Sequence, residues 1–150
     1  MAKSQLTVGI RIDGVRETLA AFRALPKDAS KELRETSLEL SRKLATSAQA
    51  AGIAEGHQAA LVAKTVRAVR DRVPAVVAGG VRRLGPRKAP AWKLLFGAEF
   101  GSTQYRQFPR LHTGRDGIWF FPTIEREAAG TAREWRAAAD RIIRAFGKVS

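Results

Sequence analysis

The first pattern along the chain is an alternation of apolar and polar residues that predicts a strand. From Gln5 to Ile12 every second residue is apolar, and these residues are Leu6, Val8, Ile10 and Ile12. A period of two places such side chains on one face of an extended segment. We therefore expect a half-buried strand here, which the Asp13-Gly14 pair brings to an end.

Apolar steps of three and four residues then predict two helices. The first starts at Val15, with Asp13 as its expected N-cap, and stops before Pro26. The second is long, because it opens at Pro26 and meets its first glycines only at Gly52 and Gly56. Its predicted inner face consists of Leu33, Ser37, Leu40, Leu44, Ala48 and Ala51.

The middle of the chain fits two interpretations. Residues 58–70 could continue as a helix, but segments 65–70 and 74–79 are separated by a short polar turn, which favours a β-hairpin. The run from Arg82 to Lys88 combines basic residues with glycine and proline. That composition predicts an exposed, flexible basic loop near residues 82–90.

The C-terminal third predicts further short elements and a last helix. Residues 91–101 indicate a helical turn followed by a short strand, and the run from Ile118 to Phe121, ended by Pro122, indicates a core strand. In such a strand Phe120 would face either a partner chain or a covering helix. A final helix starts near Thr123, with an apolar stripe of Ile124, Ala128, Thr131, Trp135, Ala139, Ile142 and Phe146.

Together these elements predict an α+β fold. A small antiparallel sheet is expected to pack against the long helix of the N-terminal half and against the C-terminal helix, in the order β-α-α-β-β-loop-β-α. The 150 residues are the usual size of one domain, and neither a linker nor an internal repeat divides them. We therefore expect a single domain over residues 1–150.

The net positive charge of the chain indicates which kinds of molecule it can bind. A formal net charge of +13 attracts polyanions and opposes contact between copies of the chain. The excess of arginine and alanine is equally what a G+C-rich coding sequence produces without selection for binding. No apolar run approaches the roughly 20 residues that cross a bilayer, and the N-terminus lacks a signal-peptide core, so no membrane partner is expected.

Residues suited to catalysis or metal binding are sparse. The chain has no cysteine, and its two histidines, His57 and His112, lie in different segments. No serine lies in a nucleophile elbow, and no glycine-rich phosphate loop is present. Glu125 and Glu127 lie at a helix start, where the helix dipole favours acids whatever the function. We therefore expect no enzyme activity, no cofactor and no metal.

Two groups of residues are candidates for contacts with partners. The basic group can bind DNA phosphates or an acidic protein partner, although too few aromatic residues lie nearby for a base-stacking platform. The aromatic group fits either the core or contacts between subunits, the core being the commoner role. The basic candidates are Arg82, Arg83, Arg87 and Lys88, and the aromatic ones are Trp92, Phe96, Phe100 and Phe120.

The segment from Phe96 to Ser102, followed by Gly117 to Ile124 and an amphipathic helix, resembles a phage family. It is similar to the minor tail-component, or tail-completion, proteins of long-tailed bacteriophages. In that family a strand, a long helix and a hairpin lead to a short E-F-G-[ST] motif, a loop, an aromatic-Pro strand end and a C-terminal helix. The chain follows this order along most of its length, but over residues 56–88 it matches by order rather than by residue.

The resemblance implies a structural protein of the virion tail or neck, assembled in the cytoplasm of the host bacterium. It implies a ring, commonly six-fold, that surrounds the DNA path at the head–tail joint. The neighbours would be connector or stopper, tail terminator or tail tube proteins. Glu99, Phe100 and Gly101 would lie at a turn near a contact between subunits, the alternative being a plain turn with a solvated glutamate. The competing function is that of a non-specific, basic DNA-binding protein.

Overall fold

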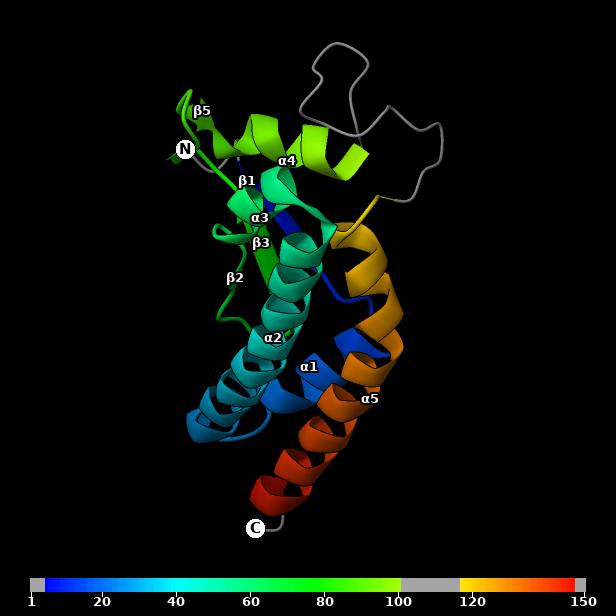
Figure 1. Ribbon diagram of the computed structural model, residues 1–150. Coiled ribbons are helices and arrows are strands. Elements are labelled where there is room, and N and C mark those ends of the chain that lie inside the picture. The colour runs from blue at the N-terminus through cyan, green and yellow to red at the C-terminus, as the bar shows by residue number, and fades with distance from the viewer. Residues whose placement is uncertain (1–4, 101–116, 148–150) are drawn as a thin grey trace.

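The computed structural model describes residues 5–100 and 117–147, and they form the α+β fold that the sequence predicts (Figure 1). The elements follow one another as β1 (Gln5–Gly9), α1 (Val15–Arg23), α2 (Lys27–Glu55), α3 (His57–Ala63), β2 (Arg67–Ala68), β3 (Ala75–Gly79), β4 (Arg83–Leu84), β5 (Ala89–Pro90), α4 (Ala91–Phe100) and α5 (Phe120–Gly147). The helices dominate, and no helix among these elements is both long and apolar enough to span a membrane.

A three-stranded antiparallel sheet has β3 at its centre, with β1 and β2 on its two sides. β1 pairs along its whole length, from Gln5 opposite Gly79 to Gly9 opposite Ala75. The predicted alternation is confirmed, because Leu6 and Val8 are partly buried and Ile10 and Ile12 are buried. β3 carries small and β-branched residues and is buried over almost its entire length, as expected of a strand covered by helices.

The region between α2 and β3 combines the two interpretations of the sequence. Residues 57–63 form a short helix, and only Arg67 and Ala68 of the expected strand pair with β3. Thr65 joins the helix to the sheet, because its Oγ1 donates to the carbonyl of Val62 at 2.7 Å and accepts the N–H of Gly79 at 2.9 Å. The predicted hairpin is therefore present but shorter than expected.

The two long helices, α2 and α5, lie side by side and antiparallel (Figure 1). Their facing sides are built from the predicted stripes, with Leu40, Leu44 and Ala48 buried on α2 and Ala139 and Ile142 buried on α5. Small residues at this contact allow the two helix axes to approach closely. α1 closes one side of the pair with Phe22, which is 2% exposed.

Trp135 ties α5 to both α2 and the sheet. Its indole Nε1 donates to Ser37 Oγ at 3.1 Å and to the carbonyl of Arg72 at 2.7 Å. Ser37 Oγ also donates to that carbonyl, and one turn later Ser41 Oγ accepts the N–H of Ala75 at 2.9 Å. Two serines on the inner face of α2 thus satisfy the polar groups of the turn that leads into β3.

Three expectations about local structure are wrong. The short strand predicted within residues 91–101 is absent, since α4 is helical from Ala91 to Phe100. The strand predicted for Ile118 to Phe121 is replaced by the start of α5. Asp13 does not cap α1, whose N-cap is Gly14 in the left-handed region at φ 78°, without a side-chain hydrogen bond.

The basic loop expected near residues 82–90 is a two-stranded hairpin, with Arg83 opposite Pro90 and Leu84 opposite Ala89. Gly85 and Lys88 both have positive φ, 75° and 52°, which closes the chain in a tight turn. Leu84 is 7% exposed and anchors the hairpin to the core. The composition indicated the turn and the exposure of the basic residues, but not the pairing.

Replacing Trp135 with phenylalanine should lower the free energy of unfolding by about 1–3 kcal/mol, because the carbonyl of Arg72 loses a donor and the buried side chain loses volume. Urea denaturation at neutral pH measures this change. The control is Trp92→Phe, which alters an exposed indole and should change the unfolding free energy by less than about 0.5 kcal/mol. Equal losses in the two variants would contradict the role assigned to Trp135.

Candidate functional site

α4 separates two kinds of side chain onto opposite faces. Leu94, Leu95 and Ala98 are buried against the core, whereas Trp92 is 36% exposed and Phe96 is 51% exposed. Trp92, Phe96 and Phe100 follow one another at intervals of four residues and so lie along one side of the helix. The ring centroids of Phe96 and Phe100 are 6.2 Å apart, and Phe121 of α5 continues the row at 5.8 Å from Phe100. We call Trp92, Phe96, Phe100 and Phe121 the aromatic stripe.

The β4–β5 hairpin is attached to the start of α4. The N–H of Ala91 donates to the carbonyl of Arg82 at 2.7 Å, and the N–H of Trp92 donates to that of Gly80 at 3.0 Å. Within the hairpin, Arg83 Nη1 donates to the carbonyl of Lys88 at 2.9 Å. We call residues 82–90 the basic hairpin, since all four of its cationic side chains are exposed: Arg82, Arg83, Arg87 and Lys88.

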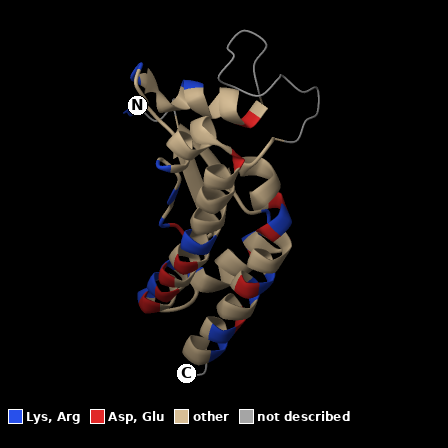
Figure 2. Ribbon diagram, in the orientation of Figure 1, with Lys and Arg blue, Asp and Glu red and all other residues tan. Residues whose placement is uncertain are grey.

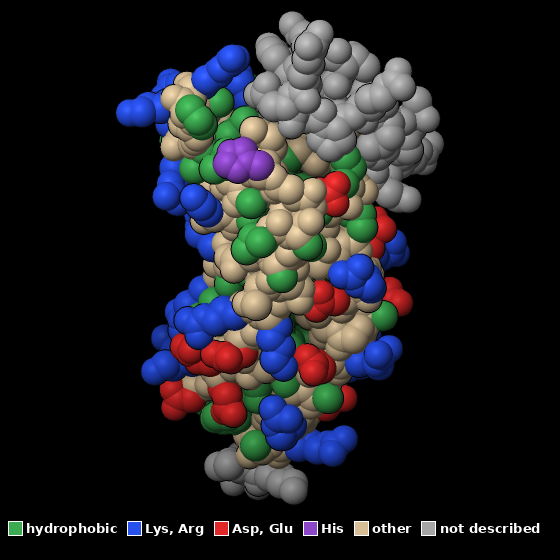
Figure 3. Space-filling model, viewed as in Figure 1, with side chains coloured by type: hydrophobic (Ala, Val, Ile, Leu, Met, Phe, Trp, Pro, Cys, Tyr) green, Lys and Arg blue, Asp and Glu red, His purple; other side chains and the backbone are tan. Residues whose placement is uncertain are grey.

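Positive charge is not balanced at this end of the molecule. From Arg72 to Ala98 the sequence holds six basic residues and no acidic one. The ion pairs found within the described ranges involve Glu35, Glu39 and Glu134, and they lie along α2 and α5. Figure 2 shows blue without red on the hairpin, whereas α2 and α5 carry both signs, and the same separation is visible on the surface in Figure 3. Lys93 adds a cation whose Nζ lies 5.4 Å from the ring centre of Trp92.

Glu99, on the inner side of α4, is fully buried and caps α5. Its Oε1 accepts the N–H of Trp119 at 2.9 Å, and its Oε2 accepts those of Phe120 at 2.6 Å and Phe121 at 3.1 Å. Its backbone carbonyl accepts the N–H of Ile118 at 2.8 Å. A carboxylate at a helix N-terminus is favoured by the helix dipole as well as by these hydrogen bonds.

Every backbone N–H group in the first turn of α5 has a hydrogen-bond acceptor. The backbone carbonyl and the carboxylate of Glu99 accept the N–H groups of residues 118 to 121, and Pro122 has no N–H. The N–H of Thr123 donates to the carbonyl of Trp119 at 3.3 Å. Four free N–H groups are the usual deficit at a helix start. Here a side chain from another helix, about 20 residues earlier in the chain, removes that deficit.

Gly117 permits this arrangement, because a Cβ at this position would overlap the carboxylate of Glu99. Burial raises the pKa of Glu99 above its ordinary value, while the hydrogen bonds from the backbone N–H groups of Trp119, Phe121 and Phe120 act in the opposite direction without cancelling the rise.

In the part of the chain that the structure describes, Trp119 Nε1 is buried without a hydrogen-bond partner.

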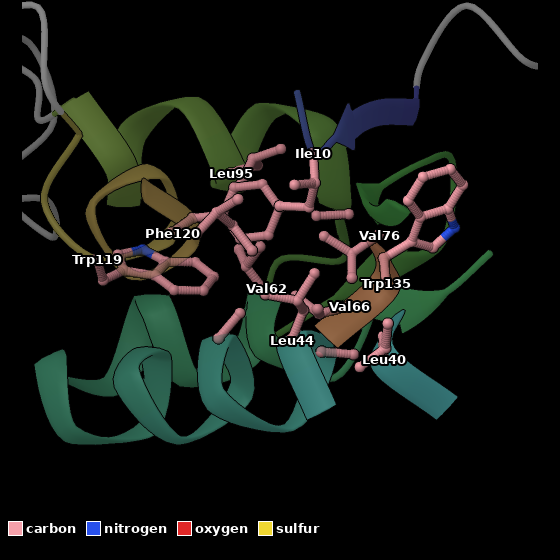
Figure 4. Packing of buried hydrophobic residues seen from close by; sticks show 14 of the residues in the cluster. Ile10, Leu40, Leu44, Val62, Val66, Val76, Leu95, Trp119, Phe120 and Trp135 are labelled. Atoms are coloured by element: carbon pink, nitrogen blue, oxygen red, sulfur yellow. The ribbon is translucent and has the colours of Figure 1, made fainter. Parts of the chain in front are cut away.

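The residues predicted to contact a neighbouring subunit divide into an exposed group and a buried group. Trp92 and Phe96 are exposed and Phe100 partly so, on one face, whereas Glu99 and Phe120 are both 0% exposed inside the subunit. The structure thus corrects the contact predicted for these two: Glu99 serves the cap, and Phe120 packs close to Leu95 and Val62 (Figure 4). The alternative of a solvated glutamate is wrong for the same reason. Gly101 lies outside the described residues.

The described ranges contain no group of three histidine, cysteine or acidic side chains arranged to hold a metal ion. His57 is exposed at the start of α3, and His112 lies outside those ranges. Comparison with known proteins found no matching family model, no matching curated protein and no matching solved structure. The resemblance to tail-completion proteins therefore stays a prediction.

Replacing Glu99 with alanine should lower the free energy of unfolding by about 2–4 kcal/mol, since three buried or partly buried N–H groups lose their acceptor. Urea denaturation, followed by far-UV circular dichroism, measures this loss. The matched control is Glu125→Ala, which removes an exposed acid from the same end of α5 and should change the unfolding free energy by no more than about 0.5–1 kcal/mol. A similar loss in both variants would mean that the cap contributes little.

The raised pKa of Glu99 also predicts a dependence on pH. Between the ordinary carboxyl pKa and the raised one, the folded chain keeps a proton that the unfolded chain has lost, so the unfolding free energy falls as pH rises through that window. Glu99→Gln cannot titrate, and wild type should therefore lose stability relative to it as pH rises above the ordinary carboxyl pKa. Urea midpoints of both proteins at a series of pH values test this. A relative gain by wild type would show that the pKa is lowered instead.

Proposed function

We propose that this protein is a structural subunit of a long-tailed bacteriophage, of the tail-completion type, which assembles into a ring at the head–tail joint. The role requires no bond to be made or broken. The proposal combines the resemblance of residues 96–102 and 117–124 to that family with one structural observation, the exposure of Trp92 and Phe96 in the aromatic stripe.

The aromatic stripe has the chemistry of a protein–protein contact. Aromatic residues are enriched at the centres of interfaces, because each buries a large area and loses little conformational freedom. Phe96 is half exposed, and Val81, which is 60% exposed, directly follows Gly80, whose carbonyl accepts the N–H of Trp92. Burying Trp92 and Phe96 against a neighbour would stabilise the contact by a few kcal/mol, at roughly 1.5–3 kcal/mol for a fully buried large apolar side chain.

The stripe is also held rigidly, which favours specific docking. The basic hairpin fixes the start of α4 through two backbone hydrogen bonds, and the Glu99 cap fixes its end. An interface on such a helix loses little entropy on binding. In a closed ring the stripe would meet a different patch on the next subunit, as a heterologous contact requires.

The net charge of +13 sets the conditions for such assembly. Like-charged subunits repel one another over about 10 Å at 0.1 M salt, and this repulsion weakens as salt rises. A contact based on apolar side chains does not weaken in the same way. Ring formation should therefore become more favourable with increasing salt.

Replacing Phe96 with arginine should prevent assembly, because it places a cation in the centre of the stripe. Multi-angle light scattering over a range of concentrations, at moderate and high salt, should show wild type as an oligomer of fixed size and Phe96→Arg as a monomer. The matched control is Ile53→Arg, which alters another exposed apolar side chain, 66% exposed, on α2 and should leave the oligomer intact.

A wild-type protein that stays monomeric in all these conditions, or a Phe96→Arg variant that assembles as well as wild type, would refute the use of the stripe. Glu99 variants do not test this contact, because they unfold the cap inside the subunit. The place in the virion is tested separately, by deleting the coding sequence from a phage that carries it. Filled heads and tails that fail to join are expected, and normal particles would exclude the role.

A further inference from the structure

The basic hairpin is a second exposed surface that ring assembly through the aromatic stripe does not use. Its four cations lie on a protruding turn, with Lys93 on the first turn of α4 beside them. Among the described residues, no acidic side chain forms an ion pair with any of these five. The cluster is therefore an unneutralised positive surface at one end of the molecule (Figures 2 and 3).

Some other cations among the described residues already have polar partners. Arg42, Lys43 and Arg70 are each paired with a glutamate, and Arg136 Nη2 donates to the carbonyl of Asp13. Within the part of the chain that the structure describes, Arg83 is the one hairpin cation that makes such a contact, through Nη1, and this bond holds the turn closed. Arg82, Arg87 and Lys88 are exposed, and no hydrogen bond from their side chains to another described residue is formed.

We propose that the basic hairpin binds the sugar-phosphate backbone of double-stranded nucleic acid, without reading its sequence. Phosphate binding gains its free energy largely from the release of counterions, and it tolerates cations on flexible, exposed side chains. Exposed ion pairs with protein carboxylates are worth only about 0–1 kcal/mol each, and the centres of protein interfaces are depleted in charge. A surface of four neighbouring exposed cations therefore fits a phosphate backbone better than an acidic protein.

Duplex is favoured over single strands because the hairpin carries no aromatic face of its own that could stack on bases. Lys93 lies over the Trp92 ring, and Phe96 is the next exposed residue along α4, directed along the stripe towards Phe100. Single-strand binding needs aromatic faces interleaved with the cations. None of the residues from Arg82 to Lys88 is aromatic.

The test compares two triple variants that remove the same charge. Arg82, Arg87 and Lys88 are replaced with glutamine in the first, leaving Arg83 to hold the turn, and exposed Arg133, Arg141 and Arg144 of α5 are replaced in the second. Fluorescence anisotropy with a short labelled duplex measures affinity over a salt series. The hairpin variant should bind on the order of tenfold or more weakly at low salt, and its slope of log affinity against log salt should be smaller by about 2.7.

The control variant should retain most of the affinity and slope. A hairpin variant with lysine at Arg82 and Arg87 should also bind like wild type, because phosphate contact needs the charge and not the guanidinium. Absence of duplex binding at low salt, or equal weakening in the two triple variants, would overturn the proposal. So would tighter binding of polyglutamate or of a single strand than of duplex.

This inference and the proposed ring can fail independently. The hairpin triple variant keeps the aromatic stripe, so its oligomeric mass should equal that of wild type, and Phe96→Arg keeps the hairpin, so its monomer should still bind duplex. Loss of duplex binding in Phe96→Arg alone would show that binding needs the oligomer rather than the hairpin, and would overturn the assignment to this site.

Discussion

The hydrogen bonds from the N-terminus of α5 to the carboxylate of Glu99 are the interaction on which the rest of the structure depends. They join the end of α4 to the start of α5 and thereby set the direction in which α5 runs along α2. The side chains that α5 contributes to the core, Trp135 and Ile142 among them, reach their places only if the helix leaves Glu99 at this angle. The bonds also hold Glu99 directly against Gly117.

The cap has an electrostatic consequence at the surface. Glu99 is the first acid after Asp71, and its carboxylate is turned inward to the dipole of α5 rather than outward to the arginines of the hairpin. Among the described residues, no acidic side chain pairs with the cations of the hairpin. Along α4, Leu95 and Glu99 lie four positions apart on the buried side, whereas Trp92 and Phe96, also four positions apart, lie on the exposed side.

Sequence patterns predicted the elements whose periodicity is regular: β1, α2 and the stripe of α5 from Ile124 to Ile142. They failed where a remote group decides the local structure. The β-prone run from Ile118 to Phe121 becomes helical because Glu99 supplies its acceptors, and Pro122, taken as the end of a strand, lies in a first turn that needs no N–H there. In the sequence, Gly117 was the one residue that could have indicated the close approach of another side chain to the start of α5. In α4 nearly every residue is apolar, so spacing alone could not separate Trp92 and Phe96 from the core.

Binding of a polyanion at the basic hairpin would weaken as salt rises, whereas contact between subunits through the aromatic stripe would become more favourable. Both effects depend on the positive charge of the subunit, so the two surfaces are energetically coupled. Salt weakens binding of a polyanion at the hairpin, and it also weakens the repulsion between subunits of charge +13. A duplex bound at the hairpins of several subunits would neutralise part of that charge and so favour contact through the aromatic stripe. By thermodynamic reciprocity, an assembled ring would then bind the duplex more tightly than a single subunit by the same factor. In the proposed ring, a strongly basic subunit would thus assemble most readily in the presence of the duplex that the hairpins are proposed to bind.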